Sequence, residues 1–371
     1  MDLDFSAEQK MLGDQAQRFL SDKEALGRSR SVLEGDAPFD RELWQEMAQM
    51  GWLGTAIPEA YGGVGMGALE LCVLAEQLGR SLAPVPFSST LYLFSEALLA
   101  YGSEEQKQRY LPQIAEGKLI GTVAVVEETA SPTENSIECA FANGKLDGCK
   151  IAVPDGDVAD VALVLARQDK VLAMYLVDLN DQSVRREQSS NLDGSRSFGR
   201  IEFSSAPAEL VGQVGQGWNQ WQKTLDRAAV FFAFEQLGLA DSTLEMAKNY
   251  ALERHAFGRP IASYQAVKHR LADMYIGAQL ARSNCYYAAW ALSTHAAELP
   301  VAAAGARIAA TQASEFNSKE NIQLHGGMGF TWEFDCHLYY RRSKVQSLVI
   351  GALPEWQNRL MTALEESNLP K

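Results

Sequence analysis

Apolar residues recur at helical spacing through the first part of the chain. Leu12, Ala16 and Phe19 follow one another on one helical face, after Ser6 and Gln9, which have the spacing of a capping box. We therefore expect an N-terminal helical domain over residues 1–116. Its further helices are predicted at residues 40–50, 68–82, 90–101 and 103–115.

The pattern changes after Gly117, where short β-branched runs are bounded by turn residues. Asn143-Gly144 indicates a tight hairpin, because both turn positions must tolerate positive φ. Short strands at this spacing predict an antiparallel, barrel-like β-domain over residues 117–211. The runs are 122–126, 148–153, 161–166, 171–177 and 197–203.

Helical periodicity returns after Gly217, as Leu237, Leu244 and Ala251 show. Long helices in succession predict a C-terminal four-helix bundle over residues 212–371. The order of helices, strands and bundle makes this an α+β chain of three domains. The later bundle segments lie near residues 267–278, 300–321 and 337–349.

The composition indicates a folded globular protein, since 47% of the 371 residues are hydrophobic. The net charge of -14 argues against binding to nucleic acid or to an anionic membrane. Five scattered cysteines without CxxC spacing argue against disulfides or a zinc site and favour a reducing, cytoplasmic setting. The N-terminal segment carries no long apolar run, so we expect no signal peptide and no membrane anchor.

Two segments of the sequence suggest a nucleotide site. Arg254 can supply a fixed cation, and Gly326-Gly327 allow the backbone to approach an ADP diphosphate closely. Each feature alone has a plainer explanation, because Arg254 can cap a helix, Phe257 can lie in the core and the glycines can form a simple turn. The sequence has no HExxH motif and no His/Asp/Ser set, so metal or hydrolase chemistry has no support.

Taken together, five segments in this order over almost the whole length resemble the acyl-CoA dehydrogenase superfamily. Each segment is a weak signal by itself, and their joint order is specific. The segments are PEAYGGVG at 58–65, YGSEEQKQRYLPQIAEG at 101–117, GQVGQGW at 212–218, RHAFGRPIASYQAVKHRLADM at 254–274 and QLHGGMGF at 323–330.

The resemblance implies an FAD-dependent oxidoreductase of fatty acid or lipid catabolism that desaturates an acyl-CoA thioester at its α and β carbons. It also implies an electron-transfer flavoprotein as acceptor, and a homo-oligomer or an assembly with a paired dehydrogenase-like subunit. In the family, two neighbouring subunits hold the ADP half of FAD between them. The matching positions are Arg254, Phe257 and Gln265 of one subunit and Gln323, Gly326 and Gly327 of its neighbour.

The predicted β-domain departs from the family in the segments that meet the flavin ring. VEETASPTENS at 126–136 contains no Gly-Ser-Asp, while Ala152 and Pro154 stand where the family has tryptophan and a hydroxyl residue. Thr129 and Ser131 are either substitute hydrogen-bond donors or turn residues in solvent. The sequence therefore does not identify the residues that contact the flavin ring.

The usual catalytic base is also missing. Desaturation needs a carboxylate to remove the α-proton while the β-hydrogen leaves as hydride. The family places this glutamate just after the segment that matches YRRSK at 340–344, and Ile350 stands there. Another family position for the glutamate matches Ala228. The candidate base is Glu235, which lies seven residues after Ala228, ~10 Å farther along nearly the same helical face. The alternative role of Glu235 is that of a buried ion-pair partner.

Three functions follow from these features. The chain is an acyl-CoA dehydrogenase with its base at Glu235, or a base-less partner subunit of a heteromeric dehydrogenase. The third option is a flavoenzyme of the same fold with different chemistry, for which no α-proton base is needed.

Overall fold

The structure, a computed structural model, describes residues 4–128 and 131–368. The chain divides into two compact units, and helices α2 (Ala25–Glu34) and α7 (Gly217–Glu253) contribute to both. The order of helices, sheet and helices confirms the predicted fold class, while the domain boundaries at 116 and 211 stay a prediction. One unit consists of Met1–Arg30, Ala68–Ala83 and Ala229–Lys371, and the other of Ser31–Gly67 and Pro84–Ala228.

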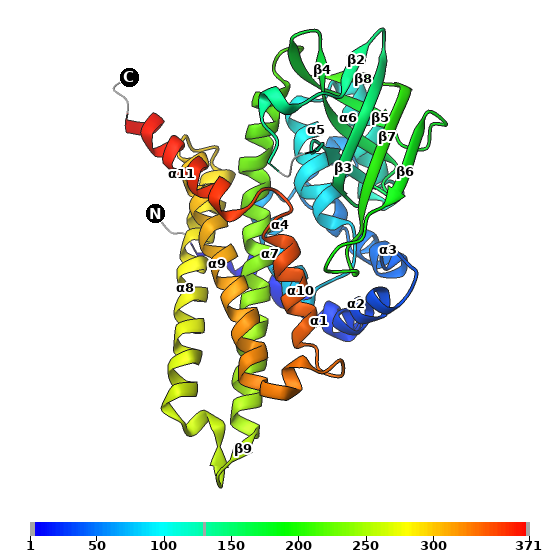
Figure 1. The fold of residues 1–371 in the computed structure, drawn as a ribbon. Helices are drawn as coiled ribbons and strands as arrows, with labels where there is room; N and C mark the ends of the chain where they lie inside the picture. Colours follow the sequence, from blue (N-terminus) through cyan, green and yellow to red (C-terminus); the bar gives the residue numbers. More distant parts are fainter. Residues whose placement is uncertain (1–3, 129–130, 369–371) are drawn as a thin grey trace. The chain divides into compact units, whose positions relative to one another are not determined.

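Helices make up most of the first unit. The capping box predicted at its start is present, because the Ser6 hydroxyl accepts the Gln9 amide at 3.2 Å and the Gln9 side chain accepts the Ser6 amide at 2.8 Å. The predicted bundle is also present, as Figure 1 shows for the helices beside α7. The helices are α1 (Ala7–Asp22), α4 (Ala68–Ser81), α8 (Gln265–Ser293), α9 (Leu299–His325), α10 (Cys336–Gln346) and α11 (Leu353–Asn368).

Polar contacts and glycines fix how these helices pack. Asn317 of α9 donates to the carbonyl oxygens of Ala240 in α7, at 3.0 Å, and of Met274 in α8, at 3.3 Å. Where α4 meets α7, a Cβ at Gly79 would overlap the carbonyl oxygen of Glu235. Glycine at this crossing lets the two backbones touch, and it thereby sets the depth at which Glu235 lies in the bundle.

A charged cluster lies beside the same helix crossing. Arg282 of α8 pairs with Glu76 of α4 at 3.1 Å and also with Asp241 of α7. Burial is the largest cause of the raised pKa of Glu76, and the charge of Arg282 opposes it. The cluster therefore supplies the charge compensation that buried carboxylates require.

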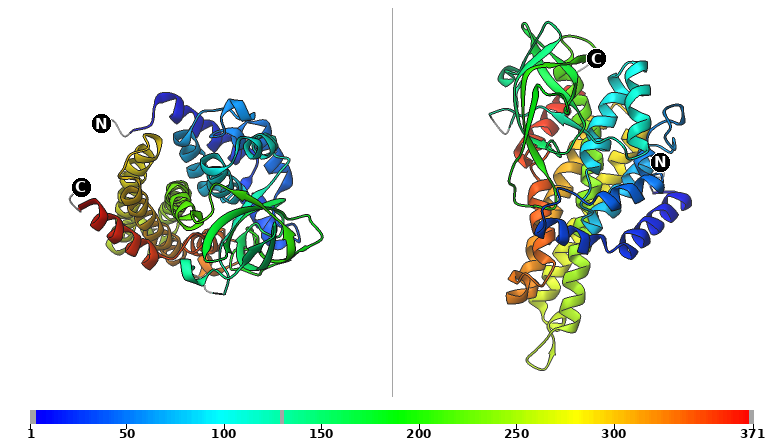
Figure 2. Two further views of the ribbon diagram at one scale, coloured as in Figure 1. Left: turned by 90° about the horizontal axis from the view of Figure 1, so that it is seen from above. Right: turned by 90° about the vertical axis from the view of Figure 1, so that its right-hand side faces the viewer.

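The second unit carries a sheet with the strand order β6-β7-β3-β2-β4-β5-β8, and β1 pairs with β4. Figure 2 shows this sheet, in green, from two further directions. Asn143 and Gly144 both have positive φ, 52° and 78°, so the predicted tight hairpin is confirmed between β2 and β3. The strands are β1 (Gly121–Ala124), β2 (Ala140–Ala142), β3 (Lys145–Pro154), β4 (Val161–Gln168), β5 (Val171–Asp178), β6 (Val184–Gln188), β7 (Phe198–Pro207) and β8 (Glu209–Val211).

Most strand pairs are antiparallel, as predicted, and two pairs differ. β1 runs parallel to β4, and β2 also pairs with β4 in parallel, through Ala140 and Arg167. The β2–β3 hairpin lies between β1 and β4 along the chain, and a long connection of this kind permits parallel pairing. Strand β6, which reads VRREQ, carries no apolar alternation, so its pairing with β7 was not predictable from the pattern.

The helices of the second unit agree with the sequence except at two places, since α2 was not predicted and the helix predicted at 90–101 is irregular. The Ser103 hydroxyl accepts the Gln106 amide at 3.2 Å, which confirms the second predicted capping box. The helix predicted at 90–101 is divided into a π-helix and an α-helix, an arrangement that no apolar spacing indicates. The helices are α3 (Arg41–Gln49), η3 (Ser88–Ser95, the π-helix), α5 (Glu96–Tyr101) and α6 (Glu104–Ala115), with 3-10 turns η1 (Trp52–Gly54), η2 (Glu59–Tyr61) and η4 (Glu134–Ser136).

Candidate functional site

The connection between α7 and α8 carries three of the predicted cofactor residues. After Arg254 the chain forms a short hairpin, β9 (His255–Ala256) and β10 (Arg259–Pro260), and then η5 (Ile261–Ser263) leads to Gln265 at the start of α8. At the hairpin tip, Phe257 has a φ of 52° and is 97% exposed. Phe257 is therefore not a core residue, so packing in the core does not explain this phenylalanine.

Arg254 and Gln265 are likewise exposed. Among the described residues, the Arg254 guanidinium has no hydrogen-bond or ion-pair partner. Its backbone amide donates to the carbonyl oxygen of Tyr250 at 2.8 Å, and its carbonyl oxygen accepts the Ile261 amide at 2.8 Å. The side chain is thus not committed to capping α7. An exposed cation of this kind remains available to an anionic ligand.

The glycine turn follows α9 directly and forms the 3-10 helix η6 (Gly326–Phe330). Gly326 has a φ of 60°, a backbone conformation that residues with a side chain rarely adopt. A Cβ at Gly329 would lie 2.5 Å from the carbonyl oxygen of Ile322 and 3.0 Å from the Cβ of His325. A Cβ at Gly327 would meet nothing within 4 Å, so packing of the described residues does not require glycine there.

The hairpin and the glycine turn lie at the same end of the bundle (Figure 1). Tyr250, in the last turn of α7, stacks on His325, the last residue of α9, with ring centroids 4.1 Å apart and an interplanar angle of 25°. Phe334 packs edge-on against both rings, at 6.2 and 5.8 Å. The structure therefore places the two segments that carry the predicted cofactor residues beside each other within one chain, while their role as half-sites and their division between two subunits stay predictions.

These features fit a dinucleotide diphosphate. An exposed guanidinium without a partner suits an anion, and a turn with open space at Gly327 admits close backbone approach. Gln323 is exposed one turn before the glycines, and its side chain is available as a hydrogen-bond donor. The residues present thus match the charge and the donors that the ADP half of FAD requires.

The position that the sequence resemblance assigns to the usual base holds an apolar side chain. Ile350 lies in the turn after α10 and is 5% exposed. Its carbonyl oxygen accepts the indole N–H of Trp356 at 3.2 Å, and Gly351 follows with a φ of 104°. The turn is thus fixed by its backbone, and the Ile350 side chain offers no proton acceptor.

Glu235, the candidate base, lies on α7 and is 3% exposed. Its Oε1 accepts a hydrogen bond of 2.6 Å from the Nε2 of Gln346, the last residue of α10. Arg307 of α9, 1% exposed, donates to the Gln236 side chain at 2.6 Å and to the carbonyl oxygen of Gln346. Glu235 therefore belongs to a buried polar network of three helices.

Burial lowers the pKa of Arg307 to about 9, and the nearby Glu235 carboxylate opposes this effect. A buried cation beside a buried carboxylate agrees with the structural alternative for Glu235. The role of Glu235 as a base stays a prediction.

Sequence reasoning missed an ion pair in the β-domain. The Lys150 Nζ, 0% exposed, lies 2.6 Å from Glu127 and donates to the carbonyl oxygen of Val125 at 3.0 Å. Glu127 also accepts the backbone amides of Glu138, at 2.8 Å, and Cys139, at 3.1 Å. The signal was present in β3, where strand alternation puts Lys150 on the same face as buried Leu146 and so demands a partner.

This pair joins the two segments that depart from the family pattern. Ala152 has a φ of 49° beside an irregularity in the β3–β7 pairing, between Lys150 and Val153. The buried Pro154 accepts the Thr122 hydroxyl at 2.6 Å through its carbonyl oxygen. Ser131 is exposed, and Thr129 lies outside the described residues.

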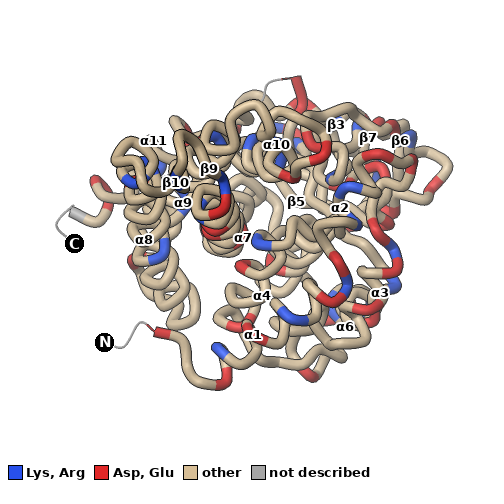
Figure 3. Tube along the Cα trace, turned by 90° about the horizontal axis from the view of Figure 1, so that it is seen from below, with Lys and Arg blue, Asp and Glu red and all other residues tan. Residues whose placement is uncertain are grey.

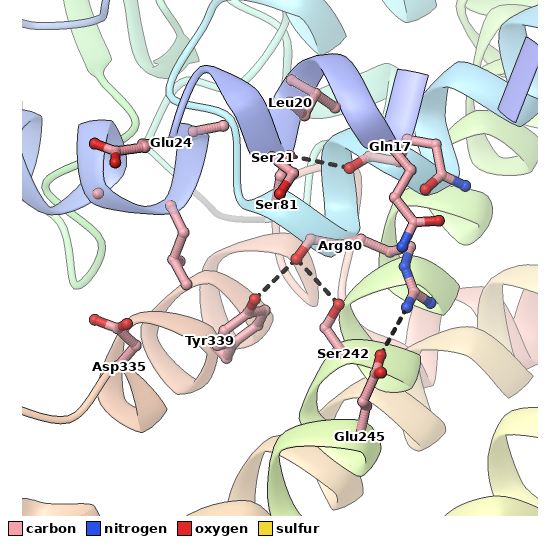
Figure 4. Close-up of a pocket in the computed structure, with 14 residues that line it drawn as sticks. Gln17, Leu20, Ser21, Glu24, Arg80, Ser81, Ser242, Glu245, Asp335 and Tyr339 are labelled. Carbon is pink, nitrogen blue, oxygen red and sulfur yellow. Dashed lines mark hydrogen bonds and ion pairs between the residues drawn. The ribbon is translucent and has the colours of Figure 1, made fainter. Parts of the chain in front are cut away.

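A cleft of about 490 Å³ in the first unit lies apart from these residues (Figure 4). Its cation, Arg80, already pairs with Glu245 at 3.1 Å and Asp241 at 3.4 Å. The Arg80 carbonyl oxygen accepts the Tyr339 hydroxyl at 2.8 Å and the Ser242 hydroxyl at 3.1 Å. The lining includes none of the predicted cofactor residues, and its polar groups are largely engaged with one another.

Acidic and basic positions are interspersed along the described trace (Figure 3). Within residues 4–128 and 131–368, no helix is long and apolar enough to cross a membrane.

Known proteins resemble both the sequence and the structure. Residues 6–118 match the family described as acyl-CoA dehydrogenase, N-terminal domain, and residues 215–353 match acyl-CoA dehydrogenase, C-terminal domain. The chain is 32% identical to the acyl-CoA dehydrogenase FadE27 of Mycobacterium tuberculosis over 344 residues. This match covers 89% of this chain and 89% of the relative.

Two solved structures are similar over nearly the whole length. The Tcur3481-Tcur3483 steroid ACAD has a TM-score of 0.88 and 31% identity, with 97% of this chain and 98% of that chain covered. A chain of the ChsE4-ChsE5 complex from Mycobacterium tuberculosis has a TM-score of 0.90 and 28% identity, with 100% of this chain and 100% of that chain covered.

Proposed function

The chain belongs to the acyl-CoA dehydrogenase family, whose members are FAD-dependent oxidoreductases of lipid catabolism, and on this premise we propose that it acts as a base-less subunit in acyl-CoA desaturation. Its substrate would be an acyl-CoA thioester, and a paired dehydrogenase-like subunit would complete the site. An electron-transfer flavoprotein is the proposed acceptor of the electrons.

The buried Ile350 carries this proposal. Removal of the α-proton requires a basic group beside the substrate, and an isoleucine side chain has no lone pair. Ala228, at the other family position for the base, has none either. The proton acceptor must therefore come from another residue of this chain or from another chain.

The preserved features point to a role in holding the cofactor. Arg254, Gln265 and Gln323 are exposed, and Gly327 has open space at its Cβ position. We propose that these residues bind the ADP half of FAD, together with Phe257 and Gly326, across a subunit interface. When bound, FAD supplies the acceptor for the hydride that leaves the β-carbon.

The pairing with a second, different chain rests on similarity. The solved structure described as the ChsE4-ChsE5 complex is an assembly of two named proteins, and this chain matches the full length of one chain of it at 28% identity. A subunit that retains a diphosphate site and lacks a base is useful where its partner supplies the carboxylate. This arrangement explains both the exposed Arg254 and the apolar Ile350.

A second candidate keeps the base within this chain, at Glu235. The observation in its favour is the buried cation of Arg307, whose charge interacts with the Glu235 carboxylate. A carboxyl group must be ionised to accept a proton. Against this role, Glu235 already accepts a hydrogen bond from Gln346.

The deciding experiment compares the chain alone with the chain co-expressed with a dehydrogenase-like partner. Each preparation is assayed for FAD stoichiometry, oligomeric state and anaerobic bleaching of the flavin by acyl-CoA thioesters. We expect bleaching with the partner present and none with the chain alone. Bleaching by the chain alone would contradict the base-less role, and flavin that reacts with oxygen but with no acyl-CoA would indicate different chemistry.

A further inference from the structure

His325 connects the two segments proposed to hold the cofactor. Its ring is 4% exposed and stacks on Tyr250, four residues before Arg254. Along the chain, His325 directly precedes Gly326. One ring pair thus joins the root of the arginine hairpin to the root of the glycine turn.

The glycine turn also folds back onto His325. Only glycine fits at position 329, because a Cβ there would lie 3.0 Å from the Cβ of His325 and 2.5 Å from the carbonyl oxygen of Ile322. Nearby, Asn321 donates to the sulfur of Met246 at 3.1 Å, which adds a second contact between α9 and α7. The turn, the last residue of α9 and the last turn of α7 therefore form one packed group.

The hydrogen bond of the imidazole defines its orientation. His325 Nδ1 lies 2.8 Å from the carbonyl oxygen of Asn321, so Nδ1 carries a proton and donates it. In a regular α-helix that carbonyl already accepts the backbone N–H four residues on. The Asn321 carbonyl oxygen therefore still has a hydrogen-bond partner when the imidazole is removed. The stack of the His325 ring on Tyr250, by contrast, is lost with the imidazole.

We infer that His325 is a positioning residue for FAD: its stack on Tyr250 holds the Gly326 turn in place against the end of α7. This inference rests on the cofactor role proposed above for these two segments. A diphosphate ligand responds to small displacements of its donors, because charge-assisted hydrogen bonds depend on distance and angle. Loss of the stack should therefore weaken FAD binding even though His325 itself is buried.

The test compares His325→Ala with His325→Phe in the assembled protein, after removal of flavin and titration with FAD. We expect the alanine variant to raise the Kd for FAD roughly tenfold, and the phenylalanine variant to stay within about twofold of wild type, since an aromatic ring restores the stack. Hydrogen exchange of the amides in 323–330 should rise in the alanine variant alone. His337→Ala, which removes a ring stacked on Trp332, is the matched control and should leave FAD affinity unchanged.

The outcomes separate this inference from the proposed function. If wild-type protein does not bind FAD, the proposed cofactor role fails. If wild type binds and His325→Ala binds equally well, the positioning role of His325 is overturned. Should His325→Ala not fold, Tyr250→Leu removes the same stack, and unchanged FAD affinity in that variant would overturn the inference equally.

Discussion

The side-chain amide of Gln346 donates a hydrogen bond of 2.6 Å to the carboxylate of Glu235, which joins the end of α10 to the middle of α7. Arg307 reaches the carbonyl oxygen of the same glutamine. Gln346 also begins the stretch that leads into the turn with Ile350. Gln346 therefore contacts the candidate base and lies four residues before Ile350 in the sequence.

Glu235→Gln separates the catalytic role of this residue from its structural one. The glutamine keeps an oxygen for Gln346 and removes the charge beside Arg307. We expect the rate of anaerobic flavin bleaching by an acyl-CoA to change less than about twofold, and the free energy of unfolding to fall by about 3 kcal/mol. Bleaching is followed in the assembled protein, and unfolding by chemical denaturation.

Glu245→Gln is the matched control for this variant, because Glu245 is exposed and pairs with Arg80 at 3.1 Å. Loss of the ion pair between Glu245 and Arg80 should lower the free energy of unfolding by less than about 1 kcal/mol. A drop in bleaching of a hundredfold or more in Glu235→Gln, with FAD still bound, would instead assign Glu235 as the base.

Two glycines of one turn should respond differently to the same substitution. Gly327→Ala places its Cβ in open space, so the stability of flavin-free protein should not change, while the Kd for FAD should rise at least about tenfold. Gly329→Ala places its Cβ against Ile322 and should lower the thermal midpoint of flavin-free protein by several degrees, roughly as an overpacked site does. Thermal unfolding and FAD titration of both variants check the contrast. Equal FAD affinity in Gly327→Ala and wild type would count against a diphosphate at this turn.

Much of the fold was predictable because it depends on periodicity. Helices α1, α8, α9 and α10 follow helical apolar spacing, whereas α11 was not predicted. Strands β4 and β5 are short apolar runs between turn residues, and the Asn143-Gly144 turn has a conformational requirement that few residues meet. The π-helix and the polar strand β6 leave no such trace. Their formation depends on neighbours that are distant in the sequence.

The candidate site was predictable only where a residue type is chemically demanding. Arg254 and the glycines stand out in the sequence, and the structure places their segments together through a contact that no motif contains, Tyr250 on His325. The Lys150–Glu127 pair was missed because the partners are far apart in the sequence. Glu235 illustrates the converse, since a glutamate in an apolar run has the same appearance whether it acts in catalysis or in a buried polar network.

Arg254→Gln should weaken FAD binding without affecting the fold. The guanidinium has no polar partner among residues 4–128 and 131–368, so its removal breaks no internal contact. We expect unchanged stability of flavin-free protein and a Kd for FAD raised about ten- to hundredfold, as for the loss of a charge-assisted hydrogen bond. Arg259→Gln is the control, because Arg259 stacks on Tyr264 at 4.1 Å in the same hairpin. Similar effects of both substitutions on FAD affinity would indicate a general charge effect in place of a specific contact.

The stability of the His325 stack should depend on pH in one direction. Burial lowers the pKa of His325, whereas an unfolded histidine titrates near 6.5. The unfolded chain therefore binds a proton at a pH where the folded chain does not. The stabilising contribution is complete above about pH 6.5 and is lost as the pH falls through the lowered folded pKa.

We expect the difference in free energy of unfolding between wild type and His325→Phe to shift against wild type between pH 8 and pH 5, because the phenylalanine variant lacks this titration. Denaturant titrations of both proteins across that range measure the difference, in which the other titrating groups largely cancel. A difference that does not change with pH would show that the imidazole is protonated equally in the folded and unfolded states.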